Sequence, residues 1–296
     1  MGEADWLHGT ETDMVIWQVD FYRRPLQDES KNPLWELAIC SADKSFAAYG
    51  FCPQSDANAA WLTSQFKALL AEGKCPDSIQ VFRPQSQSLI QAAVEQFDIR
   101  VIPTRRTPAL KEYLQDRAAI YPTLPQYDPI QGMDYQPIAI ESPPPVPIPD
   151  ALWGDRWRFG AMKAGDLEPF FRDKPIPVLD IPSHLSPMQL GLSSEVNIPG
   201  VVIDGGRQSM RLAQWLREQQ PVALNYISGA PDGLILDVGL CDRFILATFD
   251  DGDMREAAIA YQRKLDYSNG LHFLLIQPDN SGMTYTGMWL LRPEPS

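Results

Sequence analysis

Histidine and cysteine are both scarce in this sequence of 296 residues, which holds three histidines and four cysteines. The histidines, His8, His184 and His272, stand far apart, so neither a histidine-based metal site nor a catalytic triad with a histidine base is expected. The cysteines form no CxxC pair and no spacing typical of a zinc site. They are therefore expected to be free, buried thiols of a reducing compartment.

Long apolar runs are also absent, and none approaches the roughly 20 residues that a membrane-spanning helix needs. The first 13 residues read as an acidic, polar tail, without the apolar segment of a signal peptide or the arginine and serine bias of a transit peptide. Met1-Gly2 fits the start of a myristoylation motif, but Trp6 occupies the position that needs serine or threonine. These absences predict a soluble, cytoplasmic protein without membrane insertion.

Positive charge is in deficit. The chain has 25 lysines and arginines against 38 acidic residues, which gives a formal net charge of −13 and a pI of about 4.6. A surface of this sign repels nucleic acid and anionic lipid, so RNA binding would require a local basic patch. The 44% hydrophobic and 21% charged content is that of an ordinary globular protein, and the length allows two domains.

One such patch lies between Ile99 and Tyr121, where five basic residues stand against two acids and give a local charge of +3. Tyrosines are interleaved with these basic residues, a combination that suits unpaired RNA, since cations attract phosphates and rings stack on bases. The alternative is an ordinary helix edge whose basic groups pair with the protein's own acids. The candidate RNA contacts in this patch are Arg105, Arg106, Tyr113 and Arg117.

The first half of the chain predicts an α/β domain over residues 14–136. Alternating apolar residues predict strands at 14–23, 34–41, 45–51, 78–82 and 99–102. Helices are predicted at 57–72, capped by Ser55 or Asp56, at 86–97, and from Pro108 to about residue 119. The resulting order, β-β-β-α-β-α-β-α, is that of the ribonuclease-H-like fold.

Nucleases of that fold hold two metal ions with carboxylates on the first strand, the first helix and the fourth strand. Asp20 lies on the first predicted strand, as required. The first helix has acids only at its ends, and the fourth strand runs into Arg83, a base where a carboxylate is needed. One carboxylate cannot hold two metals, so the sequence predicts the fold without its nuclease site, and no metal or other cofactor.

A proline-rich linker is predicted over residues 137–150, followed by a second α/β domain over 151–296. Just past the linker lies a second basic-aromatic cluster, in which Trp153, Arg156 and Trp157 are candidate RNA contacts; closely spaced tryptophans are also common as packing anchors. Beyond a mostly irregular region at 163–199, the pattern predicts a mixed sheet with two helices. The strands are expected near 201–203, 222–228, 233–240, 243–249, 271–277 and 284–292, and the helices at 207–219 and 254–267.

Three features of the second half resemble functional motifs only in part. Gly205-Gly206 follows a strand and precedes a helix, but the Gly-Lys-Ser/Thr ending of a phosphate loop is missing. Asp237 lacks the lysine that a restriction-type nuclease needs beside it. The acids at 250–253 have the wrong spacing for a calcium loop, and Asp253 with Glu256 instead predicts a capping box.

Short motifs along nearly the whole chain resemble the Tab-two family (Atab-two in land plants), whose members are RNA-binding translation factors for photosystem reaction-centre subunits. The motifs lie at residues 16–25 (IWQVDFYRRP), 35–37 (WEL), 102–107 (IPTRRT), 121–122 (YP), 152–157 (LWGDRW), 229–233, 266–270 and 289–291 (WLL). The resemblance implies a non-enzymatic protein that promotes translation and biogenesis of photosystem I, and as a further target photosystem II.

The same resemblance implies that Trp289, Leu290 and Leu291 bind the A/U-rich leader of a messenger RNA. Without a transit peptide, it points to a cyanobacterial, cytoplasmic member that also contacts translation or photosystem-assembly proteins. Two other functions stay open at this point: a protein–protein scaffold in photosystem assembly, and a degenerate metal-dependent nuclease.

Overall fold

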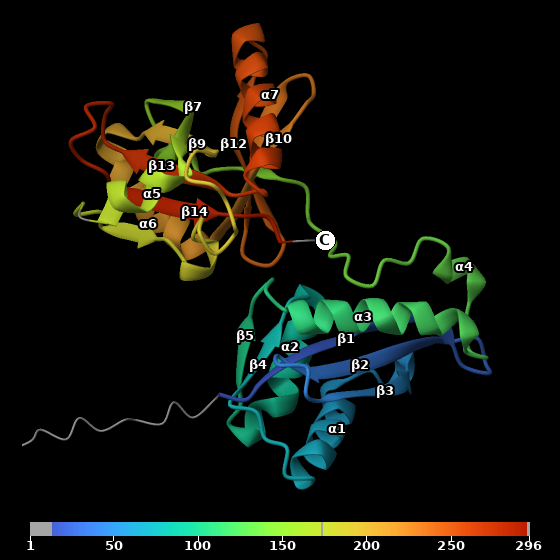
Figure 1. Cartoon of the computed structure of the whole chain (residues 1–296). Coiled ribbons are helices and arrows are strands. Elements are labelled where there is room, and N and C mark those ends of the chain that lie inside the picture. Colours follow the sequence, from blue (N-terminus) through green and yellow to red (C-terminus); the bar gives the residue numbers. More distant parts are fainter. Residues whose placement is uncertain (1–13, 173, 295–296) are drawn as a thin grey trace, which may run out of the picture. The chain divides into compact units, whose positions relative to one another are not determined.

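The computed structural model describes residues 14–172 and 174–294, and the chain divides into two compact units (Figure 1). The polar tail expected over residues 1–13 lies outside the described residues. The division between the units falls between Ile140 and Glu141, inside the proline-rich segment 137–150. That segment is built into both units at its ends, because Ile138 packs in the first unit and Ile148 is buried in the core of the second.

The first unit holds a single five-stranded sheet. Its strands are β1 (Ile16–Gln27), β2 (Pro33–Ser41), β3 (Ala47–Pro53), β4 (Ser78–Val81) and β5 (Arg100–Pro103). They lie in the order β3-β2-β1-β4-β5. The first three strands pair antiparallel, whereas β4 runs parallel to β1 and β5 parallel to β4.

Helices cover both faces of this sheet, namely α1 (Ala59–Ala71), α2 (Pro84–Val94) and α3 (Pro108–Ile120), with the single turn α4 (Pro129–Gly132) after them. Successive side chains of β1 point to opposite faces of the sheet, so each face packs against a different set of helices. Trp17, Val19 and Phe21 pack with α1 and α2, whereas the side chains between them point to the opposite face, where Gln18 accepts a hydrogen bond from the start of α3. Element order and strand order are those of the ribonuclease-H-like fold, so that prediction is confirmed.

The second unit contains two sheets. The strands β7 (Arg156–Lys163), β8 (Val178–Asp180), β9 (Asn197–Asp204), β13 (His272–Gln277) and β14 (Gly287–Leu291) form a mixed sheet. Its order is β7-β9-β13-β14-β8. A second sheet is built from β6 (Val146–Pro147), β10 (Pro221–Ile227), β11 (Asp232–Val238) and β12 (Asp242–Phe249), in the order β10-β11-β12-β6.

The two predicted helices of this unit are α6 (Ser209–Gln219) and α7 (Gly252–Tyr267), which share a core with side chains from both sheets. The α/β class is thus confirmed, and the structure adds a second sheet and the helix α5 (Ala164–Arg172). Pro169 lies inside α5, and proline normally argues against a helix, which explains why the sequence pattern missed it. None of the helices in the described part of the chain combines the length and apolarity needed to cross a bilayer.

Two predicted helix caps are wrong by a few residues. Asn58 caps α1 by accepting a hydrogen bond from the Trp61 N–H at 3.0 Å, while Gln54–Asp56 form a separate 3₁₀ turn. Asp251 caps α7 in the same way through the Met254 N–H at 2.9 Å, which places Asp253 in the first turn. Several short polar residues precede each helix, and the pattern alone does not choose among them.

A buried histidine joins the two sheets of the second unit. His272 lies on β13, and its Nε2 accepts the N–H of Leu224 on β10 at 2.8 Å. Its Nδ1 lies 2.8 Å from the carbonyl oxygen of Gly270, so this nitrogen carries the proton and donates it. Because both ring nitrogens are used in this way, the neutral tautomer is the one that fits the site.

Acidification should therefore destabilise the second unit. Burial lowers the pKa of His272 to about 4, whereas an unfolded histidine titrates near pH 6.5. The unfolded state binds the extra proton first, so the stabilisation is complete above pH 6.5 and falls as the pH drops toward 4, by roughly 3 kcal/mol in total. Urea titrations across this pH range should show the loss in the wild type. They should show a flatter profile in His272→Gln, and parallel profiles would contradict this account.

Candidate nucleic-acid interface

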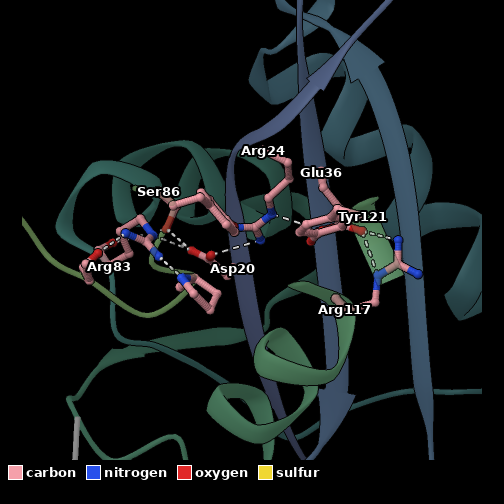
Figure 2. A network of polar contacts seen from close by, with 10 residues as sticks. Asp20, Arg24, Glu36, Arg83, Ser86, Arg117 and Tyr121 are labelled. Atoms are coloured by element: carbon pink, nitrogen blue, oxygen red, sulfur yellow. Dashed lines mark hydrogen bonds and ion pairs between the residues drawn. The ribbon is translucent and has the colours of Figure 1, made fainter. Parts of the chain in front are cut away.

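The face of the first sheet that packs on α3 carries a buried network of charged side chains (Figure 2). Asp20 and Arg24 share this face of β1, and Glu36 on β2 stands opposite Tyr22, diagonal to both. Oδ2 of Asp20 accepts from Nη2 of Arg24 at 3.1 Å, and Oε2 of Glu36 accepts from Nε of the same arginine at 2.9 Å.

Two further arginines complete the network. Arg83, at the junction of β4 and α2, donates from Nε to Oδ1 of Asp20 at 3.0 Å. Arg117 on α3 donates from Nε to Oε1 of Glu36 at 2.9 Å, and the Tyr121 hydroxyl donates to Oε2 of that carboxylate. All five charged side chains are nearly sealed from solvent, and three arginines face two carboxylates.

This arrangement occupies the place where ribonuclease-H-like nucleases hold their metals. Figure 2 shows both oxygens of Asp20 directed at guanidinium groups, with Ser86 also within 3.4 Å of Oδ1. Within the described ranges, no group of three or more histidine, cysteine or acidic side chains is placed to hold a metal ion. Fixed cations thus fill the position that divalent ions would take.

Burial and charge shift the pKa values of Arg24 and Tyr121 in this network. Burial lowers the pKa of Arg24, but the opposing charges, that of Asp20 first, outweigh it and leave this pKa well above the ordinary value. Burial also raises the pKa of Tyr121 far above its usual range, so its hydroxyl stays protonated and donates to Glu36. Each charged side chain of the network thus has a hydrogen-bonding partner within it, as a buried polar cluster requires.

Arg117 was predicted to contact RNA, and the structure places it in the buried network, where it is 6% exposed. Its guanidinium is spent on Glu36 and on the ring of Tyr49, whose centroid lies 3.5 Å from the Arg117 Cζ. Tyr113 is half-buried against the cluster formed by α3 and β2, and burial raises its pKa. Glu36 lies 81 residues before Arg117 in the chain, a pairing that the local sequence does not reveal.

Arg105 and Arg106 lie in the turn between β5 and α3. The Arg106 side chain is exposed and Arg105 is half-buried. The turn is held by local hydrogen bonds, since the Arg106 N–H donates to the Thr104 hydroxyl and the Thr107 N–H to the Arg105 carbonyl, both at 3.1 Å. The candidate contacts of the first patch that remain near the surface are therefore Arg105, Arg106 and part of Tyr113.

The terminal tripeptide, Trp289, Leu290 and Leu291, is buried on both faces of β14. The Trp289 side chain is 1% exposed and packs with Leu291 in the core between the two sheets, while Leu290 joins the cluster around α5. The resemblance implied direct base contact through these three side chains; in this structure they present almost no surface to a ligand, and that role stays a prediction. β14 is buried on both faces because side chains from other elements pack against both sides of its sheet.

The second basic-aromatic cluster divides between core and surface. Trp157 and Phe159 point into the core, with the Trp157 ring 5.3 Å from that of Phe159, so Trp157 is a packing anchor. Arg156 and Arg158 point to the other face of β7, and their side chains are 67% and 47% exposed. Trp153, just before the strand, is 43% exposed.

Both exposed arginines bind one buried carboxylate, that of Asp204 at the end of β9. Arg158 donates from Nη1 to both its oxygens, at 3.0 and 3.1 Å, and Arg156 Nε lies 3.2 Å from Oδ2. Gln277 on β13 donates to Oδ1 at 2.7 Å. Burial acts to raise the pKa of Asp204, but these hydrogen bonds and charges outweigh it and lower it, so the carboxylate stays ionised.

Two family profiles match the chain. The profile described as "RNA-binding protein Tab2/Atab2 N terminal" matches residues 16–117, and "RNA-binding protein Tab2/Atab2, C-terminal domain" matches residues 135–292. The chain belongs to the Tab2/Atab2 family of RNA-binding proteins. The resemblance read from the short motifs is thereby confirmed.

Two plant members of the Tab2/Atab2 family are similar over most of their length. "Protein TAB2 homolog, chloroplastic" of Arabidopsis thaliana is 27% identical over 281 residues, covering 93% of this chain and 74% of that protein. The protein of the same name from Zea mays is 27% identical over 289 residues, covering 94% and 72%.

Two solved structures show a distant similarity. The HTLV-2 integrase catalytic core domain in complex with magnesium, in its dimeric form, has 18% identity and a TM-score of 0.25 over 37% of this chain and 75% of that one. A simian T-cell lymphotropic virus intasome bound to a PP2A regulatory subunit has 11% identity and a TM-score of 0.28, over 50% and 62%. The ribonuclease-H-like assignment rests on the strand order of the first unit and not on these scores.

Sequence reasoning missed Asp204, Tyr49 and the partners of Asp20. Asp204 is an acidic residue at the end of an apolar strand and is followed by two glycines. An acid in that position was the sequence signal that could have marked it as a functional residue. The Tyr49 ring on the edge strand β3 is 55% exposed, with Arg117 against it. The Tab2/Atab2 motifs at 16–25, 35–37 and 121–122 contain four members of the buried network, so these segments mark the fold as much as any interface.

Proposed function

We propose that this Tab2/Atab2 protein binds the single-stranded, A/U-rich leader of a messenger RNA and promotes translation and biogenesis of photosystem I, with photosystem II as a further target. It acts in the cytoplasm of a cyanobacterium, together with translation or photosystem-assembly proteins. The observation that carries the RNA contact is the exposure of Trp153 and Arg156, a ring and a cation three residues apart in a chain of net charge −13.

The proposal assigns no catalysis to the protein. Asp20, the only strand acid in the position of a nuclease carboxylate, is held by Arg24 and Arg83. A nuclease would need those oxygens for a divalent ion. Incubation of an A/U-rich RNA with the full chain and Mg²⁺ or Mn²⁺ should leave the RNA intact, and metal-dependent cleavage by a highly purified sample would overturn this part of the proposal.

Replacing both Arg105 and Arg106 by alanine should weaken RNA binding. Each phosphate contact on a single strand contributes about 0.7 to the slope of log affinity against log salt, so losing two contacts should reduce that slope by about 1.4. Filter-binding titrations of the full chain at several salt concentrations measure this. Lys74→Ala, which removes an exposed cation elsewhere in the first unit, is the matched control. Unchanged affinity and slope in the double variant would remove this turn from the interface.

The acidic surface favours a second candidate, a protein–protein scaffold in photosystem assembly, because a net charge of −13 discourages RNA in general. Ultraviolet crosslinking in cells, purification of the protein and sequencing of attached RNA distinguish the two. The RNA-binding proposal predicts enrichment of A/U-rich leaders. Recovery of proteins without enriched RNA would favour the scaffold.

A further inference from the structure

We infer that Arg156 and Arg158, held side by side by the buried carboxylate of Asp204, form a phosphate clamp that grips the backbone of the RNA strand, with the Trp153 ring beside it as a platform for one base. This inference rests on the proposed RNA binding and deepens it. It assigns phosphodiester recognition to two named guanidinium groups and gives Asp204 a positioning role.

The clamp differs from an ordinary surface ion pair in its burial. Asp204 is 2% exposed, whereas the arginines that it holds are 67% and 47% exposed. One carboxylate, fixed from behind by Gln277, thus orients two cations whose remaining N–H groups point to solvent. The cluster keeps one net positive charge, and its guanidinium groups lose less side-chain freedom when a phosphate binds.

The spacing of the arginines also suits the backbone of a single strand. Arg156 and Arg158 are two residues apart on β7, so they share one face at a separation of roughly 7 Å. That distance is comparable to the step between successive phosphates of an extended strand. β7 is the outer strand of its sheet, which leaves this edge open to a ligand. Guanidinium groups bind phosphate oxygens through paired N–H donors.

The loop before β7, which carries Trp153, is held against the backbone of Asp204. The Asp155 N–H donates to the Asp204 carbonyl at 2.8 Å, and Gly154 lies so close that a Cβ there would approach that carbonyl oxygen to 2.9 Å. Gly206 adopts a positive φ of 52°, and a Cβ at this position would lie 2.5 Å from Asp155 Oδ2. These glycines fix the loop that carries the exposed Trp153 against the end of β9, the strand that ends in Asp204.

The change in RNA affinity on Asp204→Asn distinguishes a clamp from a simple basic patch, because the two predict changes in opposite directions. The substitution removes a negative charge beside two arginines while leaving an oxygen that can accept from Gln277. If the arginines act as a simple basic patch, the variant should bind RNA more tightly. The clamp predicts weaker binding, by roughly tenfold, because the arginines lose their orientation. The measurement is fluorescence anisotropy of a labelled A/U-rich single strand with the full chain, alongside a thermal melt.

Arg156→Lys with Arg158→Lys tests the clamp without touching the buried acid. The charge is retained but the planar donor pairs are lost, so a similar weakening is expected. Replacing both by alanine should also lower the salt slope by about 1.4. The matched control is Arg255→Ala, which removes an arginine 46% exposed and paired to another buried acid, Asp232. That variant should bind RNA like the wild type.

The outcomes separate the clamp from the proposed function. Wild-type protein that fails to bind any A/U-rich single strand overturns both. Wild-type binding with equal or tighter binding by folded Asp204→Asn overturns the clamp alone. Where that variant unfolds, the double lysine variant decides, and unchanged affinity there overturns the clamp.

Discussion

Trp289→Ala should lower the free energy of unfolding of the second unit by about 3–5 kcal/mol. The indole is 1% exposed and fills the core between the two sheets, with Gly287 packed so tightly that a Cβ there would lie 2.6 Å from the Trp289 ring. Truncation leaves a cavity that neighbouring strands cannot close without moving. Urea denaturation followed by circular dichroism measures the loss, and Trp289→Phe should recover part of it.

The RNA affinity of Trp289→Ala should fall only in proportion to the fraction of molecules in which the second unit is unfolded. The surface residue Trp153 provides the opposite case, because Trp153→Ala removes a ring that is 43% exposed. That variant should unfold close to the wild type yet bind RNA more weakly, since stacking on one base contributes roughly 1–3 kcal/mol. A stable, fully folded Trp289→Ala protein that no longer binds RNA would show that the terminal tripeptide contacts the ligand after all.

Glu36→Ala should destabilise the first unit by about 3–5 kcal/mol. The Glu36 carboxylate accepts hydrogen bonds from Arg24, Arg117 and Tyr121, all buried. Its removal leaves Arg117 without its main counter-charge and leaves Arg24 paired with Asp20 alone. The loss is large because the partners stay behind in the core. Chemical denaturation of the full chain, read through hydrogen exchange in β1 and β2, assigns the effect to this unit.

Glu112→Ala is the matched control for that experiment. Glu112 on α3 pairs with Lys44, but both side chains are more than half exposed, so little change in stability is expected. Equal stabilities of Glu36→Ala and Glu112→Ala would contradict the view that the buried network holds this sheet to α3. Loosening of the segment after α3 is also expected in Glu36→Ala, because Arg24 donates to the Tyr135 hydroxyl at 3.3 Å.

Much of the first unit could be predicted from the sequence because its signals are local. Alternation along β1 and β2 and the proline at the start of α3 each act over a few residues. Arg83 in the position of a nuclease carboxylate was likewise visible. The structure shows the role of this arginine. It donates to Asp20 at 3.0 Å and to the carbonyl oxygens of Pro137 and Ala139, and so ties the segment after α3 to the sheet.

The buried side of the candidate site could not be predicted, because it depends on partners far away in the chain. Arg117 has the spacing of a surface residue on a basic helix. Its ion pair with Glu36 becomes visible only when β2 is placed beside α3 in the folded unit. The alternation around Trp289 favours a buried core position, and the structure shows which partners bury it, namely side chains from both sheets of the second unit. Asp204 and Arg158 are separated by 46 residues, so their pairing follows from the antiparallel register of β7 and β9.

Ultraviolet crosslinking of the purified full chain to an A/U-rich single strand, with mass-spectrometric mapping of the attached peptides, tests the central claim most directly. That claim is that exposed cations and rings on a non-catalytic protein hold an unpaired RNA. Attachment should concentrate at residues 153–158, with a second group at 104–106, and the RNA should be recovered uncut in the presence of Mg²⁺. Attachment confined to residues 287–291, or recovery of cleaved RNA that depends on the metal, would contradict it.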